Sequence, residues 1–266
     1  MKDKKEKREK SPEAKRLYLS ILLALIALIS IVAASVAWFT IADFTKVYSM
    51  GLDVTTGTNL RFDLDPHPTY EQYVKTLNFS QIANRIKQDK GYDMRNVPLE
   101  PVTTSDYRTF HLEDGTIVSN TSGSYLEFTL HFMATKDMLV HLTSANSQGQ
   151  TDGTGVNSSN ANLPPAMRIS FSVDGKFFVY DPGMGDGASQ SGNVTTFGLN
   201  DADHMILNDN NQLFWLTANV NKEVIVRVWL EGTDPECTDQ LRKADYSISL
   251  RFVGTDKDHN ILDGSR

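Results

Sequence analysis

Cysteine is almost absent from this chain of 266 residues. Cys237 is the only one, so no disulfide bond can form within the chain and the fold must be held together by side-chain packing. The surrounding sequence, DPECTD, reads as an exposed polar loop, and a lone cysteine in such a loop is rarely a nucleophile. We therefore expect Cys237 to have no catalytic role.

Catalytic and nucleotide-binding motifs are also missing. The sequence has no H-E-x-x-H, no G-x-S-x-G, no G-x-x-x-x-G-K-[ST] and no paired C-x-x-C. The histidines are scattered along the sequence. His131 and His141 could be neighbours on the outer faces of paired strands, where a solvated side chain is a better interpretation than a metal site. The sequence thus predicts a protein that is not an enzyme and needs no cofactor.

Positive charge is scarce except at the N-terminus. Residues 1–16 hold eight of the 26 Lys and Arg residues and four of the 33 Asp and Glu residues. The rest of the chain is therefore strongly acidic. A nucleic-acid-binding surface needs clustered Lys and Arg, so nucleic acid is excluded as a partner.

One long apolar run stands out against this background. Leu17–Ala42 reads LYLSILLALIALISIVAASVAWFTIA and contains no charged residue. A helix needs about 20 mostly apolar residues to cross a bilayer, and this run exceeds that length. With the basic tail 1–16 in the cytoplasm, the positive-inside rule places residues 43–266 outside the cell membrane. The run predicts a single-pass anchor in the lipid bilayer.

The same run fits a cleaved signal sequence. Ser35 and Ala37 are small residues placed to suit cleavage before Trp38, which would release a secreted protein. The apolar core from Leu17 to Val32 is longer than the roughly 7–15 residues usual in signal sequences, which favours the retained anchor.

The exported part is patterned for β-strands. Alternation with a period of two places Leu126, Phe128, Leu130 and Phe132 on one face, and the same pattern recurs at Met167–Val173, Glu223–Leu230 and Tyr246–Phe252. Asp174-Gly175 is typical of a hairpin turn. Strands with one wet face predict a mainly β fold, an antiparallel β-sandwich of jelly-roll type.

Two further elements are expected near the start of this domain. Residues 46–66 read as two short strands joined by a turn at Thr55–Thr58, which would form a first hairpin. A small helical insertion is expected near residues 69–90, with a capping box of Thr69 and Gln72 opening one helix and a second short helix ending near Gly91. Residues 144–162 and 181–193 are predicted surface loops.

Two carboxylate groupings are candidate sites. Asp256, Asp258 and Asn260 have the opening spacing of a Ca²⁺ loop, but the sixth position lacks glycine and the closing glutamate is missing, so solvated loop residues are the better interpretation. Glu231 and Asp234 lie beside Pro235 and Cys237. We favour a structural role, in which Asp234 caps a helical turn from Pro235 to about Leu241, over a carboxylate site.

Three fragments carry a resemblance: SVAWFT at Ser35–Thr40, SMGLDVTTGTNL at Ser49–Leu60 and VWLEGTDPECTDQLRKADYSISLRF at Val228–Phe252. They resemble exported proteins of Gram-positive bacteria related to TasA and camelysin, and are most similar to uncharacterised clostridial members. The resemblance implies a jelly-roll sandwich and a structural role in which an N-terminal strand enters the sheet of the next subunit. It covers the leader, the first strands and the last strands, and leaves residues 65–222 largely unmatched. No catalytic residue is carried over from it.

These observations predict a cell-surface structural or interaction protein, membrane-anchored or secreted, with self-assembly into an extracellular fibre or matrix as one form of interaction. The alternative is an extracellular hydrolase or a carbohydrate-binding module acting on cell-wall or matrix polymer. A hydrolase would need two carboxylates about 5–10 Å apart in a cleft. A carbohydrate-binding module would need exposed aromatic rings on one sheet face, with Tyr125, Phe178 and Tyr180 as the candidates.

Overall fold

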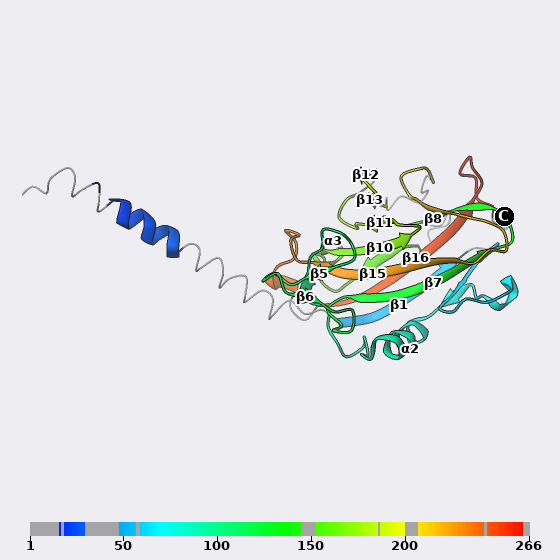
Figure 1. The fold of residues 1–266 in the computed structure, drawn as a ribbon, viewed down its shortest axis with the longest axis horizontal. Coiled ribbons are helices and arrows are strands. Elements are labelled where there is room, and N and C mark those ends of the chain that lie inside the picture. Colours follow the sequence, from blue (N-terminus) through cyan, green and yellow to red (C-terminus); the bar gives the residue numbers. More distant parts are fainter. Residues whose placement is uncertain are drawn as a thin grey trace, which may run out of the picture. The chain divides into compact units, whose positions relative to one another are not determined.

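The computed structural model describes residues 16, 19–29, 48–56, 59–144, 153–185, 187–199, 207–241 and 244–262. Residues 1–43 and 44–266 form two compact units, which are considered separately. In the first unit, residues 19–29 are helical (Figure 1). The large apolar side chains of this helix are exposed. Within the described part of the chain, no helix combines the length and apolarity needed to cross a bilayer. Residues 17, 18 and 30–42 of the predicted anchor lie outside the described residues.

The second unit is mainly β. Its strands are β1 (Tyr48–Thr56), β2 (Leu60–Asp63), β3 (Thr76–Leu77), β4 (Pro101–Val102), β5 (Phe110–His111), β6 (Ile117–Val118), β7 (Leu126–Ala134), β8 (Met138–Leu142), β9 (Gly155–Asn157), β10 (Met167–Val173), β11 (Lys176–Tyr180), β12 (Gly187–Ser191), β13 (Val194–Gly198), β14 (Gln212–Leu216), β15 (Lys222–Glu231) and β16 (Asp245–Thr255). The helical elements are α2 (Phe79–Lys90), α3 (Leu163–Ala166) and the 3₁₀ turns η1 (Tyr70–Gln72) and η2 (Asp239–Leu241).

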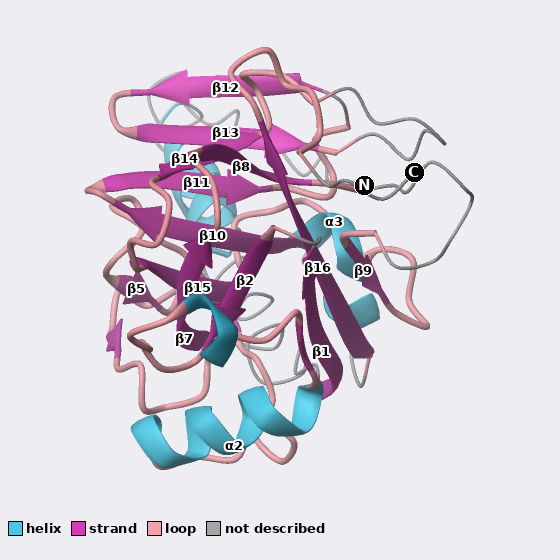
Figure 2. Ribbon diagram, turned by 90° about the vertical axis from the view of Figure 1, so that its right-hand side faces the viewer, coloured by secondary structure: helices cyan, strands magenta, loops and turns pink. Residues whose placement is uncertain are grey.

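The strands form two large sheets and one small hairpin. One sheet has the order β14-β8-β16-β1-β3, with β9 paired to β16. The other has the order β12-β13-β11-β10-β15-β7-β2, with β4 paired to β15, and β5 pairs with β6 separately (Figure 2). Both large sheets are mixed, because β1 runs parallel to β16, β13 to β11 and β4 to β15. The predicted mainly β fold is confirmed, but the predicted antiparallel arrangement holds only in part, because each large sheet also contains at least one parallel pair.

The inner faces of the two large sheets share one hydrophobic core. Phe132 of β7 lies 5.0 Å from Phe252 of β16 and 5.3 Å from Phe214 of β14, measured between ring centroids. Phe171 of β10 lies 5.7 Å from Phe252. Aromatic side chains of one sheet thus pack edge-to-face on those of the other, a favourable arrangement of aromatic rings.

The predicted alternation within the strands is confirmed. In β16 the side chains that point into the core are at most 1% exposed, and the serines and arginine between them are partly exposed. The core positions are Tyr246, Ile248, Leu250 and Phe252. The hairpin at Asp174-Gly175 is also confirmed, because both residues have a positive φ, 49° and 76°, and join β10 to β11.

The predicted first hairpin is wrong. β1 and β2 both exist, but β1 pairs with β16 and β3 in one sheet, and β2 pairs with β7 in the other. The chain therefore passes from one sheet to the other between Thr56 and Leu60. Pairing of β1 with the most C-terminal strand is a long-range contact, to which a local turn pattern gives no clue.

The helical insertion is confirmed in its second half only. α2 begins after Asn78, whose side chain accepts a hydrogen bond from the backbone N–H of Gln81 at 3.1 Å, and it ends at Gly91 with a φ of 82°. The helix expected from Thr69 is reduced to η1, and Thr76–Leu77 form β3 instead. α2 packs beside β7 and β1 (Figure 2).

One carboxylate on the outer face of the eight-stranded sheet fastens this insertion. Glu127 of β7 accepts hydrogen bonds from Lys90 of α2 at 2.8 Å, from Arg227 of β15 at 2.7 Å and from Asn120 at 2.8 Å. The side chain of Glu127 is only 14% exposed. Glu127 therefore links a helix, a loop and two strands at a largely buried position.

A second hydrophobic cluster covers part of the same outer face. Phe110 stacks on Tyr125 at 4.1 Å and lies edge-to-face with Trp229 at 5.3 Å. The β5–β6 hairpin thus buries residues that alternation alone would place in solvent. Tyr125 is only 4% exposed as a result.

Candidate functional site: a groove beside strand β14

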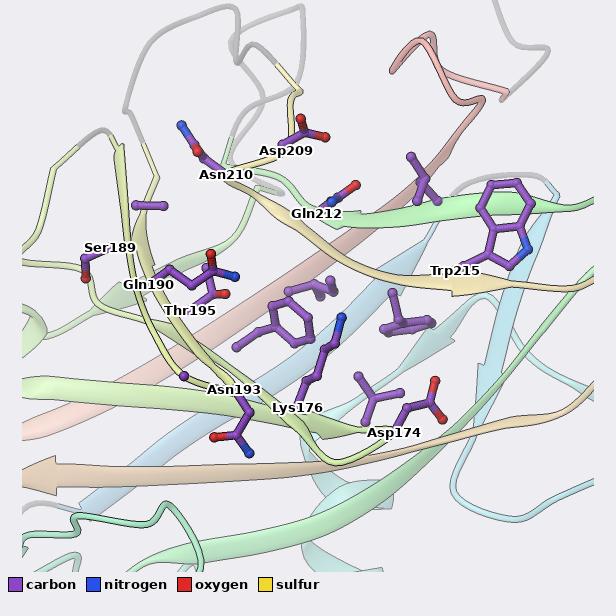
Figure 3. A pocket seen from close by; sticks show the side chains of 17 residues that line it. Asp174, Lys176, Ser189, Gln190, Asn193, Thr195, Asp209, Asn210, Gln212 and Trp215 are labelled. Carbon is purple, nitrogen blue, oxygen red and sulfur yellow. The ribbon is translucent and has the colours of Figure 1, made fainter.

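A groove of about 840 Å³ opens between β14 and the strands β11, β12 and β13 (Figure 3). It takes residues from the edge strand of each large sheet, since β12 ends one sheet and β14 ends the other. Its lining is Leu139, Val173, Asp174, Lys176, Phe178, Ala188, Ser189, Gln190, Gly192, Asn193, Thr195, Asp209, Asn210, Gln212, Leu213, Phe214 and Trp215. The volume is within the range of small-molecule sites.

Two hairpin tips build the lower wall. The β10–β11 turn positions Asp174, whose carboxylate pairs with Lys222 at 2.8 Å. The β12–β13 turn positions Asn193, whose Nδ2 donates to the carbonyl oxygen of Gly175 at 2.8 Å and so ties the two tips together. In Figure 3 the side chain of Lys176 projects from this wall into the groove, with Gln212 and Asp209 on the opposite side.

The lining alternates between apolar and neutral polar groups. Amide and hydroxyl side chains outnumber charged ones, and they can both donate and accept hydrogen bonds. The indole of Trp215 is 37% exposed at one end of the groove, with the Nζ of Lys257 6.0 Å from the ring centroid. Such a lining suits a ligand that has both hydroxyl groups and an apolar face.

The aromatic residues proposed from the sequence for carbohydrate binding do not form an exposed face. Tyr125, Phe178 and Tyr180 are 4%, 9% and 5% exposed. Phe178 contributes to the groove wall, while Tyr125 lies under Phe110 and Tyr180 belongs to the main core. The sequence could not show this burial, because alternation along a strand does not reveal which segment covers the outer face.

Glu231 and Asp234, the candidate carboxylate pair, have separate partners. Glu231 accepts hydrogen bonds from the indole N–H of Trp229 at 2.9 Å and from the hydroxyl of Thr233 at 2.7 Å. Asp234 accepts from the backbone N–H of Glu236 at 3.0 Å and pairs with Arg168. Burial would raise the pKa of Asp234, but its bonds to Glu236 and Arg168 outweigh burial and lower it.

The turn that follows is shorter than predicted. The backbone N–H of Cys237 bonds to the carbonyl oxygen of Asp234 at 3.0 Å, which closes a turn around Pro235. The 3₁₀ helix begins only at Asp239, so Asp234 caps a turn rather than the predicted helix from Pro235. Cys237 is 7% exposed, against the expectation of an exposed loop. Burial and, less strongly, the nearby carboxylates raise the pKa of its thiol to about 12.

Arg168 is a residue that the sequence did not single out. Its guanidinium lies 3.2 Å from the carboxylate of Asp181 and also contacts Asp234. The side chain is 14% exposed. The alternation in β10 predicts that Arg168 lies on the solvent-exposed face, and nothing in the sequence indicates that Asp181 and Asp234 are its partners. This cluster holds the end of β15 against β10 and the loop after β11.

The Ca²⁺ candidates form a loop held by its own hydrogen bonds. One carboxylate oxygen of Asp256 accepts from the backbone N–H of Asp258 at 2.8 Å and of Asn260 at 2.9 Å. The amide of Asn260 donates to the other oxygen at 3.0 Å. Over the described ranges, no group of three or more His, Cys, Asp or Glu side chains is arranged to hold a metal ion.

The histidine pair weighed from the sequence is not a pair. His131 lies on β7 in one sheet and His141 on β8 in the other. His141 is fully buried, not on a solvated face, and contacts Asn211, Thr255 and His259. Sequence reasoning missed this grouping because its members come from three distant segments.

Comparison with protein-family models, with curated proteins and with solved structures found no match to this chain.

Proposed function

We propose that this chain is a non-catalytic interaction protein of the cell surface, anchored in the membrane by residues 17–42 and presenting its two-sheet domain outside. The observation that carries this proposal is the helix at residues 19–29, whose large apolar side chains are 52–60% exposed. They are Leu19, Ile21, Leu22, Leu23, Leu25, Ile26, Leu28 and Ile29. A helix that is apolar all round needs an apolar environment, and the uncharged sequence continues to Ala42.

Membrane fractionation tests the anchor. The full chain, expressed with a C-terminal tag, should stay in carbonate-washed membranes, and external protease should cleave the domain on intact cells. Leu28→Arg with Ile29→Arg should release it, because each arginine at the centre of residues 17–42 costs about 2.5–3.5 kcal/mol on insertion scales. Leu28→Ile with Ile29→Leu is the matched control. N-terminal sequencing of a mature chain that begins near Trp38 would overturn the anchor.

The proposal includes self-assembly of copies of this chain. It also includes a jelly-roll fold for the two large sheets. The resemblance described above implies an N-terminal strand that enters a neighbouring subunit. Here β1 lies between β16 and β3 of its own chain. Strand exchange between copies would require β1 to leave this place, so we expect assembly to be slow and to depend on partial unfolding.

Glycan binding is a second candidate function, favoured by the lining of the groove. Hydroxyl and amide groups there match sugar hydroxyls, and apolar side chains match the C–H face of a sugar ring. Hydrolysis is less favoured, because the carboxylate of Asp174 is paired with Lys222 and Figure 3 places Asp174 and Asp209 on opposite sides of the groove.

Titration of the full chain with neutral glucan and chitin oligosaccharides tests the glycan candidate. Gln190→Ala and Gln212→Ala should each weaken binding, because each removes a hydrogen-bonding amide from the groove. Ser249→Ala, on a strand that does not line the groove, is the control. Equal affinities for all four proteins would reject the groove as the glycan site.

A further inference from the structure

Two imidazole rings from distant segments meet beside the end of β8. His141 belongs to β8 and is fully buried, and His259 follows β16 with 21% of its side chain exposed. The Nδ1 of His259 lies 3.5 Å from the Nε2 of His141. The ring centroids are 5.3 Å apart and the ring planes are inclined by 79°.

The outer nitrogen of each ring faces an oxygen atom. The Nδ1 of His141 is 2.9 Å from the Oδ1 of Asn211, which also accepts the backbone N–H of Asn208 at 3.1 Å. This Oδ1 is thus an acceptor, so the Nδ1 of His141 carries the proton and its Nε2 keeps a lone pair. The Nε2 of His259 faces the carboxylate of Asp209 at 3.4 Å. Metal-binding histidines usually have their outer nitrogen held in this way.

A hydroxyl group completes the inner side. The Oγ1 of Thr255 lies 3.1 Å from the Nε2 of His141. Its hydrogen is donated to the carbonyl oxygen of Asp256 at 3.0 Å, which leaves the lone pairs of Oγ1 for other partners. The Nε2 of His141 therefore has two possible co-ligands within 3.5 Å, the Nδ1 of His259 and the Oγ1 of Thr255.

The separations match those around a small metal ion. Zinc–nitrogen bonds of about 2.0–2.1 Å in tetrahedral geometry place two ligand atoms about 3.3–3.4 Å apart. The observed separations of 3.5 Å and 3.1 Å lie on either side of that value.

We propose that His141 Nε2, His259 Nδ1 and Thr255 Oγ1 form a binding site for one first-row transition metal ion such as Zn²⁺, with water at the remaining position. The three proposed ligands do not line the groove, whereas Asp209, which faces His259, does. Imidazole ligands select Zn²⁺, Ni²⁺ or Cu²⁺ over Ca²⁺ and Mg²⁺, which prefer oxygen. A bound ion would tie the segment after β16 to β8.

Zinc titration of the full chain in mild detergent tests the proposal. Isothermal calorimetry after removal of metals should show one Zn²⁺ per chain and no response to Ca²⁺, and Zn²⁺ should raise the melting temperature. His259→Asn should weaken binding by more than about 100-fold, beyond the 10–100-fold loss typical of outer partners. Asparagine is suitable because His259 has a φ of 61°, which asparagine tolerates.

Two further variants make the result decisive. Asp209→Ala keeps every ligand but removes the partner of His259, so it should weaken binding by about 10–100-fold. His111→Asn removes a histidine of the separate β5–β6 hairpin and should bind as the wild type does. If His259→Asn fails to fold, Asp209→Ala decides in its place.

The proposal is overturned by a wild-type chain that takes up no Zn²⁺, or by His259→Asn and Asp209→Ala variants that bind Zn²⁺ as tightly as the wild type does. In either case the contact between His141 and His259 is only a hydrogen bond between imidazoles. Because membrane fractionation and glycan titration do not depend on zinc, failure here leaves those tests of the proposed function untouched.

Discussion

Replacing Glu127 with glutamine should destabilise the two-sheet domain by about 2–4 kcal/mol. The glutamine keeps the shape and one acceptor of the side chain, but it leaves Lys90 and Arg227 without a counter-charge at a site where their side chains are only 19% and 10% exposed. Removing one partner of a fully buried ion pair costs about 3–5 kcal/mol, and partial exposure makes the expected loss smaller.

Urea unfolding of the full chain in mild detergent, followed by circular dichroism at pH 7, measures this loss as a shift of the midpoint. Glu223→Gln is the matched control, because Glu223 lies on the same outer face of β15 and is exposed. The control should change the free energy of unfolding by less than about 0.5 kcal/mol.

Acid provides a second signature of the same interaction. Burial would raise the pKa of Glu127, but the bonds from Lys90 and Asn120 and the charge of Arg227 outweigh it and hold the pKa below its ordinary 4.5. The stability from the ionised carboxylate is therefore complete above pH 4.5 and is lost as the pH falls through the lower folded-state value. The difference between wild type and Glu127→Gln should shrink over that range. Equal midpoints at pH 7, or a difference that acid leaves unchanged, would refute this reasoning.

Three other predictions follow from buried positions. Leu250→Ala should lower the free energy of unfolding by about 2–5 kcal/mol in urea titrations and Ser249→Ala should be nearly neutral, whereas equal losses would place the register one residue off. Asp234→Ala should cost about 2–3 kcal/mol, more than a turn cap alone, because Arg168 loses a carboxylate partner; thermal melting checks it, and an unchanged melt would contradict it. Native Cys237 should resist iodoacetamide at pH 8 and react in urea, because burial raises its pKa to about 12; equal labelling rates would mean the thiol is accessible.

Features that depend on neighbouring residues in sequence could be predicted well. The alternation at Leu126–Phe132 and Tyr246–Phe252, the turn at Asp174-Gly175 and the end of α2 at Gly91 all follow from side-chain period and positive φ. These features are local, so the chain itself carries the signal.

Features that depend on tertiary pairing could not be predicted. β1 and β2 look like a hairpin, yet each joins a different sheet. His141 has the strand position of a solvated residue, but the segments around Asn211 and His259 cover it. The groove combines β14 with hairpin tips of the opposite sheet, so its lining is defined only once the strand order is known.

The parallel pair of β1 and β16 also constrains the order of folding. These strands are the first and the last of the domain in sequence, and the sheet around them cannot close until residues 245–255 are available. During synthesis the N-terminus emerges first. β1 therefore has no β16 to pair with until almost two hundred further residues have been made. Closing so long a loop is slow, and an open sheet edge invites pairing with other chains. The interval between the emergence of β1 and of β16 is thus when wrong association between copies is most favoured.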